Sequence, residues 1–163
     1  WLGIYRRELI EHHQLQFEPG LHHQDIPWTT EFMLLAKRVR YTEAVLYRYY
    51  MHDASISNRK RTGERNVEYQ RHYMKIARLL EELNDRYRDR VKIYPSFHYQ
   101  VTHEALSVCH SVRREPDARA RQAIIAELFA TRTHLRMLRN ARGIKQWYQL
   151  LLWLARLYRW RYK

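Results

Sequence analysis

A carboxylate between a turn and a helix is the first residue in this sequence whose position suggests chemistry. Asp25 follows a turn at residues 17–20 and precedes an apolar-rich stretch that predicts a helix over residues 26–37. A carboxylate in that position can cap the helix by accepting hydrogen bonds from its first N–H groups. It can equally act as a general base, because it is held in place and is exposed to a cleft. The spacing leaves both roles open.

Two pairs of adjacent histidines, His12-His13 and His22-His23, are the next candidates, because histidine is a common metal ligand. Adjacent side chains point apart on a helix or a strand, so neither pair forms a chelate by itself. The sequence has no Gly-rich phosphate loop, no GxSxG elbow and no HExxH motif. Cys109 borders an apolar helical stripe, which favours a buried thiol over a reactive one.

Hydrophobic periodicity predicts the elements that position these groups. Between residues 39 and 51, Val and Tyr residues such as Val45 and Tyr47 alternate with other types, which predicts two short strands or one bent strand. Beyond residue 60, apolar residues recur at spacings of three and four, which predicts helices. These stripes run from Tyr69 to Leu83, from Phe97 to Val112, and through Ile124, Ile125, Leu128, Phe129 and Leu135. We therefore expect a mainly α fold with a short β element, divided into a mixed part at residues 1–60 and a helical part at residues 61–163.

Basic residues exceed acidic ones, and the excess lies near the C-terminus. The 163 residues include 30 Lys+Arg and 17 Asp+Glu, which gives a formal net charge of +13. Residues 118–163 carry eleven basic side chains and one acidic side chain, Glu127. A one-sided basic field attracts polyanions, either nucleic acid or an anionic membrane surface. Because helix-turn-helix, zinc-finger and RRM signatures are missing from the sequence, we do not expect nucleic acid as a partner.

Cysteine usage and hydropathy exclude several classes of protein. A single cysteine cannot form an internal disulfide framework or a Cys-rich zinc site. No run of about 18 apolar residues occurs, so we expect no membrane-spanning helix. The sequence begins at Trp1 and has no signal-peptide pattern, and we expect it to be a piece of a longer protein.

The last predicted helix, residues 144–161, is amphipathic. Its apolar face is predicted to carry Trp147, Leu150, Leu151, Leu154 and Tyr158, and its opposite face Lys145, Gln149, Arg156, Arg159 and Lys163. A helix with aromatic and aliphatic residues on one side and cations on the other can lie in a membrane interface. We expect the following residues to meet an anionic membrane surface: Trp147, Leu151, Leu154, Arg156 and Arg159. The alternative is that the apolar face packs on the rest of the domain.

Five short motifs occur in order within the first 60 residues. They are Trp1-x-x-Ile4-Tyr5-Arg6-Arg7-x-Leu9-Ile10, then Phe17-x-x-Gly20, then Gln24-Asp25, then Leu46-Tyr47-x-Tyr49 after Tyr41, then His52-x-x-Ser55-Ile56-Ser57. Together they resemble the C-terminal half of the family 2 glycosyltransferases, which have the GT-A nucleotide-sugar fold. Further segments, at residues 22–26, 69–73 and 108–110, are similar to the lipopolysaccharide-core glucuronic acid transferases of enterobacteria.

The resemblance implies inverting transfer of a sugar from a nucleotide-sugar donor, with glucuronic acid as the sugar and lipopolysaccharide core as the acceptor. It places the catalytic base at Asp25. It assigns substrate contacts to five residues: Trp1, Gln24, Trp28, His52 and Ser55. It also puts His52 near a divalent metal, Mg or Mn. Gln24 stands where the family usually has Glu.

The resemblance further implies that residues 1–60 are the C-terminal part of a GT-A α/β domain and that residues 61–163 are a helical bundle. The Asp-x-Asp metal motif of the nucleotide-binding half does not occur in this sequence, so we expect this chain alone to be inactive. The implied location is cytoplasmic, peripheral on the inner face of the inner membrane. The alternative function is a non-enzymatic basic helical module that binds membrane surfaces or anionic partners.

Overall fold

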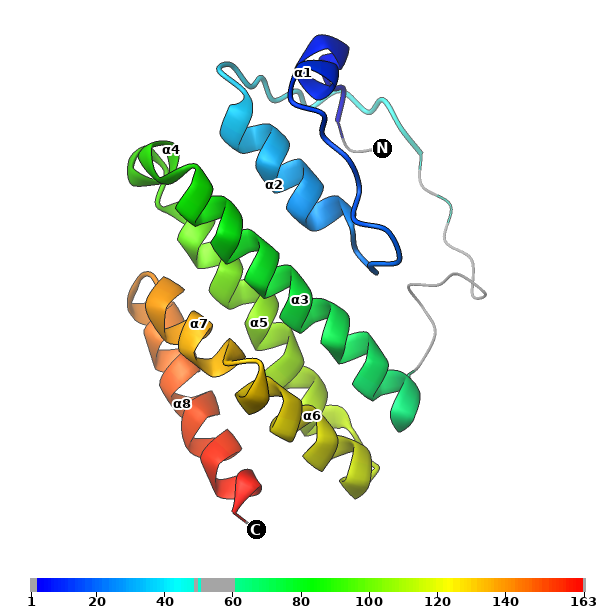
Figure 1. Cartoon of the computed structure of the whole chain (residues 1–163), viewed down its shortest axis with the longest axis vertical. Coiled ribbons are helices and arrows are strands. Elements are labelled where there is room, and N and C mark those ends of the chain that lie inside the picture. Colours follow the sequence, from blue (N-terminus) through cyan, green and yellow to red (C-terminus); the bar gives the residue numbers. More distant parts are fainter. Residues whose placement is uncertain (1–2, 49, 51–60, 163) are drawn as a thin grey trace.

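Most of the chain forms helices where the three-and-four spacing predicts them (Figure 1). The computed structural model describes residues 3–48, 50 and 61–162. The helices in these residues are α1 (Arg7–His12), α2 (Asp25–Leu35), α3 (Glu64–Arg86), α4 (Arg88–Ile93), α5 (Ser96–Arg114), α6 (Ala118–Ala130), α7 (Thr133–Asn140) and α8 (Ile144–Arg161).

Helices α3 to α8 form an antiparallel bundle. The long helices α3 and α5 lie side by side and run in opposite directions, and α6 and α7 return along them (Figure 1). Helix α8 then packs against α5, α6 and α7. Short connections between successive helices favour this up-and-down arrangement. Helix α2 lies on α3, and α1 lies against α2.

The bundle core consists of aliphatic side chains that are almost completely buried. They include Ile76 and Leu80 of α3, Val101 and Val108 of α5, Ile124 and Leu128 of α6, Met137 of α7, and Leu150 and Leu157 of α8. Cys109 of α5 is fully buried among them, and burial raises the pKa of its thiol to about 12. The predicted buried thiol is thus confirmed. A smaller cluster around Leu15 and Phe32 joins α1 to α2.

One buried carboxylate ties the start of α3 to the connection between α5 and α6. Glu115 is only 2% exposed, and its oxygens accept hydrogen bonds from Gly63 N at 3.1 Å, Asn66 Nδ2 at 2.5 Å and Asp117 N at 3.0 Å. Asn66 Oδ1 in turn accepts hydrogen bonds from Gln70 Nε2 and Ser111 Oγ. A buried carboxylate is tolerated only when N–H groups satisfy it in this way.

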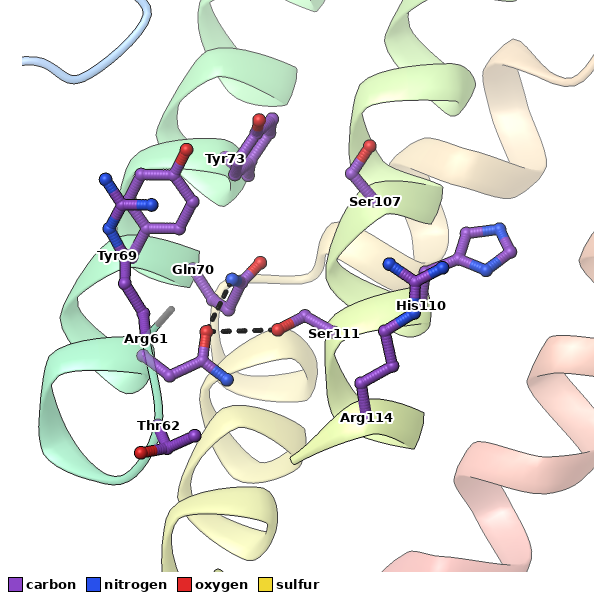
Figure 2. A pocket seen from close by; sticks show the side chains of 10 residues that line it. Arg61, Thr62, Tyr69, Gln70, Tyr73, Ser107, His110, Ser111 and Arg114 are labelled. Carbon is purple, nitrogen blue, oxygen red and sulfur yellow. Dashed lines mark hydrogen bonds between the residues drawn. The ribbon is translucent and has the colours of Figure 1, made fainter. Parts of the chain in front are cut away.

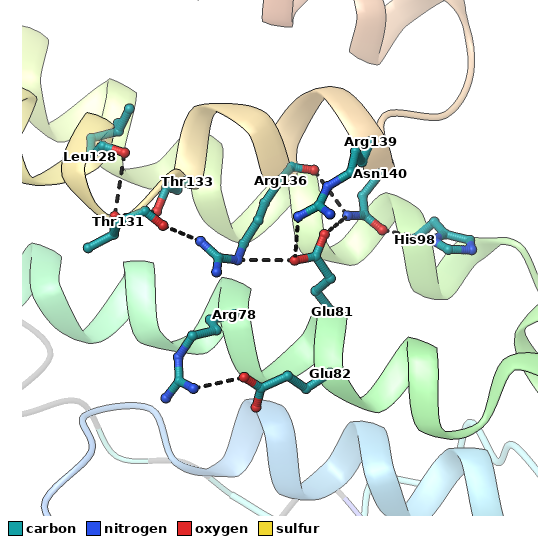
Figure 3. Close-up of polar contacts among 10 residues, drawn as sticks. All are labelled: Arg78, Glu81, Glu82, His98, Leu128, Thr131, Thr133, Arg136, Arg139 and Asn140. Carbon is teal, nitrogen blue, oxygen red and sulfur yellow. Dashed lines mark hydrogen bonds and ion pairs between the residues drawn. The ribbon is translucent and has the colours of Figure 1, made fainter.

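A second polar cluster joins the middle of the bundle (Figure 3). Glu81 of α3 forms ion pairs with Arg136 at 3.1 Å and Arg139 at 3.0 Å, and it accepts a hydrogen bond from Asn140 Nδ2 at 2.9 Å. Asn140 also contacts His98 of α5 at 2.7 Å. Helix α7 is therefore fixed to α3 and α5 by polar contacts as well as by its apolar face.

The predicted β element is wrong for the part of the chain that the structure describes, and so is the prediction that residues 1–60 include a piece of an α/β domain. Residues 39–48 form no strand, and Tyr49 and Met51 lie outside the described residues. The apolar side chains of this segment are exposed, with Val45 at 93%. A strand needs a neighbour to pair with its backbone N–H and C=O groups, and no such neighbour exists in the described residues. Alternation alone does not supply that neighbour.

Burial separates two leucines that the sequence pattern had placed in one stripe. Leu128 is completely buried, whereas Leu135 is 41% exposed. We expect Leu128→Ala to lower the free energy of unfolding by about 2–5 kcal/mol, because it leaves a cavity in the core. Leu135→Ala should change it by less than about 1 kcal/mol. Urea unfolding followed by circular dichroism measures the free energy of unfolding of both variants. Equal losses of stability in the two variants would contradict the burial of Leu128 in the core.

Candidate functional site

An open, partly polar concavity of the bundle lies between the N-terminal half of α3 and the C-terminal half of α5 (Figure 2). It is an open cavity of about 870 Å³. It is lined by Arg61, Thr62, Asn66, Tyr69, Gln70, Tyr73, Ser107, His110, Ser111 and Arg114. Its volume falls within the range, roughly 300–1,000 Å³, of cavities that bind small molecules.

The walls of this cavity combine cations, aromatic rings and hydroxyl groups. Arg61 lies at one side and Arg114 at the other (Figure 2), and the Arg61 guanidinium lies over the Tyr69 ring at 3.9 Å. Burial lowers the pKa of His110, and the guanidiniums of Arg114 and Arg113 add to this effect. No carboxylate is among the lining residues. The cavity therefore presents positive charge together with neutral hydrogen-bonding groups.

Asp25 lies beside this cavity and is connected to it through His23. His23 Nε2 and the Tyr69 hydroxyl share a 2.5 Å hydrogen bond, and the His23 ring lies 5.2 Å from that of Tyr73. Burial lowers the pKa of His23, whereas the neighbouring Asp25 carboxylate raises it. Asp25 itself is exposed. The predicted base thus interacts electrostatically with a histidine that contacts two residues lining the cavity.

Asp25 does not cap α2 through its side chain. Gln24 occupies the N-cap position, with helical dihedral angles and no side-chain capping bond, and Asp25 is the first residue of the helix. The helix dipole at this end favours a negative charge. The structure therefore does not show hydrogen-bonded capping by the Asp25 side chain.

A second carboxyl group, on Glu104 of α5, lies close enough to Asp25 for their charges to interact. Burial raises the pKa of Glu104, and the Asp25 carboxylate raises it further, while His103 lowers it. Two carboxyl groups in different surroundings can take different protonation states at the same pH. Glu104 was not among the residues predicted for the site, because nothing in the sequence distinguishes it from a solvated acid on a helix.

Gln24 and Trp28, the two predicted substrate contacts among the described residues, do not line this cavity. Gln24 is exposed just before α2. Trp28 is half-buried in an aromatic cluster, stacked on Phe17 at 5.0 Å and on Phe32 at 5.8 Å. Packing of these rings accounts for Trp28 without a ligand. Trp1, His52 and Ser55 lie outside the described residues.

The cavity residues were visible in the sequence only as parts of other patterns. Tyr69 and Tyr73 belong to the α3 stripe, which predicted core positions, yet the structure leaves both rings half-buried with their hydroxyl groups near His23 and each other. Gln70, which lies between these two tyrosines in the sequence, is buried. A polar residue within a buried helical face is the one signal that could have marked this wall.

The described residues form no metal centre. Across residues 3–48, 50 and 61–162, no group of three His, Cys, Asp or Glu side chains is arranged to hold a metal ion. His12 and His13 pack edge to face at 4.8 Å, and His22 packs in the same way on His72. His52, the predicted metal neighbour, lies outside the described residues.

The apolar residues of α8 divide differently from the predicted face. Leu150, Trp153, Leu154 and Leu157 are buried against the bundle, so Leu154 is not available to a membrane. Trp147 and Leu151 are exposed, as are Arg156 and Arg159. None of the described helices combines the length and the apolar character that a membrane span requires.

Comparison with known proteins defines the class. Residues 62–163 match the family described as the C-terminal domain of the glycosyltransferase YibD, and the chain belongs to that family. The chain is also 55% identical over 163 residues to a protein of Escherichia coli (strain K12) described as uncharacterized glycosyltransferase YibD. The match covers 100% of this chain and 47% of that protein, so the chain spans about half the length of its relative. No solved structure matches the chain.

The proton affinity of His23 makes a pH-dependent contribution to stability. Because its pKa is lowered in the folded protein, the unfolded chain binds the proton more readily, and stability should fall as the pH drops below about 6.5. His72, His110 and His134 act in the same direction. The raised pKa of Glu104 has the opposite sign and offsets part of the loss at lower pH.

We therefore expect the decrease in melting temperature between pH 7.5 and 5.5 to be smaller in His23→Gln than in the wild type. Glutamine keeps a hydrogen-bonding group near Tyr69 but does not titrate. His12→Gln, which changes an exposed residue of α1, is the control and should retain the wild-type decrease. Identical pH profiles in His23→Gln and the wild type would contradict the lowered pKa of His23 in the folded protein.

Proposed function

We propose that this chain is the acceptor-side part of an inverting family 2 glycosyltransferase that transfers a sugar from a nucleotide-sugar donor to lipopolysaccharide core. The observation that carries the proposal is the exposed Asp25 at the first turn of α2, joined through His23 to the cavity between α3 and α5. The membership of the chain in a glycosyltransferase family supports it. The relative is about twice as long. We place the GT-A nucleotide-binding half in the remainder of a whole protein of that length.

In this proposal Asp25 acts as the general base. Its carboxylate takes the proton from an acceptor hydroxyl while that oxygen attacks the anomeric carbon of the donor from the face opposite the nucleotide. A new glycosidic C–O bond forms, the bond to the diphosphate breaks, and the nucleotide diphosphate leaves with the electron pair. Exposure of Asp25 leaves room for an acceptor, and a positioned base of this kind contributes roughly 10²–10⁴-fold to the rate.

The surroundings of Asp25 suit proton transfer. His23 and Glu104 are its titratable neighbours, and burial disfavours the charged form of each. The basic C-terminal region, with its excess of Arg and Lys, would attract the polyanionic acceptor.

A divalent metal, Mg or Mn, belongs to the proposal for the whole protein only. The described residues do not offer a set of ligands that fits one, and we assign no step of the reaction on these residues to a metal. Glucuronic acid as the transferred sugar is also part of this proposal, and it is based on the resemblance to the family 2 glycosyltransferases.

We further propose that α8 holds the protein on the cytoplasmic face of an anionic membrane. Besides its buried face, α8 has an outward apolar stripe that contains Ile144, Trp147, Tyr148, Leu151, Leu152 and Tyr158, all of them exposed. Their spacing of three and four residues puts them on one side of the helix. The exposed cations Lys145, Arg156 and Arg159 lie along this stripe. Such a helix can rest in a lipid interface while its other face remains packed on the bundle.

Asp25→Asn in the full-length protein tests the catalytic proposal. Sugar transfer should fall by about 10²–10⁴-fold, because the amide cannot accept the proton, while the melting temperature stays close to that of the wild type. Asp89→Asn, at an exposed position of α4, is the matched control and should keep its activity. Undiminished transfer by Asp25→Asn would favour the non-enzymatic basic module instead.

The double variant Leu151→Glu/Leu152→Glu tests the membrane proposal. Deleting α8 would not serve, because it would remove the buried Leu150 and Leu157. Binding to vesicles of phosphatidylethanolamine and phosphatidylglycerol should fall at least about tenfold, since the stripe loses apolar contact and gains two negative charges that the anionic surface repels. Ile93→Glu/Leu135→Glu changes two exposed apolar residues on other helices and should bind normally. Binding is measured by flotation of the protein with the vesicles, and equal binding of the two double variants would overturn the proposal.

A further inference from the structure

The cavity between α3 and α5 contains a buried hydrogen-bond acceptor without a donor. Gln70 is 4% exposed, and its Nε2 donates to Asn66 Oδ1 at 2.8 Å. Its Oε1 is buried and has no hydrogen-bond partner in the described part of the chain. Figure 2 shows this oxygen on the side of Gln70 that faces the space between the two helices. Because buried polar atoms are nearly always paired, this position favours a ligand that donates a hydrogen bond.

Charge at the rim of the cavity indicates the second property of the ligand. Arg61 and Arg114 approach the cavity from opposite sides (Figure 2). Arg114 is exposed and forms no ion pair within the described residues, and the lining has no acid to neutralise it. Guanidinium groups bind carboxylates and phosphates through paired hydrogen bonds. A ligand with an anionic group would therefore be held at this rim.

The remaining walls suit a saccharide. The half-buried rings of Tyr69 and Tyr73 form one wall, and Ser107 of α5 adds a hydroxyl group on the other. Aromatic rings with polar tips pack against apolar C–H faces while they hydrogen-bond to hydroxyl groups at the edge. A sugar ring has both kinds of surface.

We propose that the cavity between α3 and α5 binds an anionic saccharide, with its carboxylate or phosphate at Arg114 and a hydroxyl group donating to Gln70 Oε1. The inference rests on the proposed function for the role of this saccharide, which would be the acceptor. Asp25 would then lie beside the bound acceptor, on the side of the cavity formed by Tyr69 and Tyr73.

Isothermal titration calorimetry of the full-length protein without donor tests the site. The probes are glucuronic acid, glucose 6-phosphate and glucose. Both anionic sugars should bind more tightly than glucose, and the tighter of the two identifies the carboxylate or the phosphate as the preferred group. Arg114→Gln should weaken both anionic sugars by about tenfold or more and leave glucose little changed, because a charged hydrogen bond is lost.

Arg113→Gln is the matched control, since Arg113 is the exposed neighbour of Arg114 but does not line the cavity. It should bind all three sugars within about twofold of the wild type. Equal losses in the two arginine variants, or no preference for the anionic sugars, would overturn the inference. Gln70→Met should weaken all three sugars, with its fold checked by circular dichroism. If Gln70→Met does not fold, the comparison of the two arginine variants decides.

The result is independent of the test of the catalytic base. Binding of the anionic sugars and transfer activity are measured separately for Asp25→Asn, because Asp25 lies outside the lining of the cavity. Sugar binding together with full transfer by Asp25→Asn would remove the proposed base and leave the binding site. If the protein does not bind the sugars but Asp25→Asn is inactive in transfer, the proposed binding site is wrong and the proposed base stands.

Discussion

The separation of α3 and α5 at the cavity depends on the buried carboxylate of Glu115. Three N–H groups, from Gly63, Asn66 and Asp117, satisfy it and join the start of α3 to the end of α5. Asn66 extends the network to Gln70 and Ser111, both of which line the cavity. A purely apolar contact here would let the two helices close on each other. Polar groups that must be paired keep them at a defined distance and leave a polar floor between them.

The sequence predicted the bundle well because its core residues follow one physical rule. Ile76, Leu80, Val101 and Val108 recur at helical spacing and are all buried. The rule fails where a residue's environment is set by a distant partner. The alternation at residues 39–48 needed a neighbouring strand, and the face of α8 was misplaced because the helix is apolar on both sides. Periodicity finds an apolar stripe but does not say which of two stripes faces the bundle.

The candidate site was predictable only where a motif carried it. Asp25 was found from its place between a turn and a helix, and the structure adds that its side chain is free of a capping bond. Gln70, Glu104 and Arg114 are ordinary polar residues in sequence. Gln70 becomes significant because its side-chain oxygen is buried and has no donor among the described residues. Such pairings between helices far apart in the chain cannot be read from local spacing.

Complete burial of Cys109 has a practical consequence for following this protein in solution. It is the sole cysteine of the sequence, and its thiol stays protonated at neutral pH, whereas alkylating reagents attack the thiolate. The native bundle should therefore resist labelling until its helices separate. The rate of thiol modification would then report on opening of the core directly, without an introduced probe.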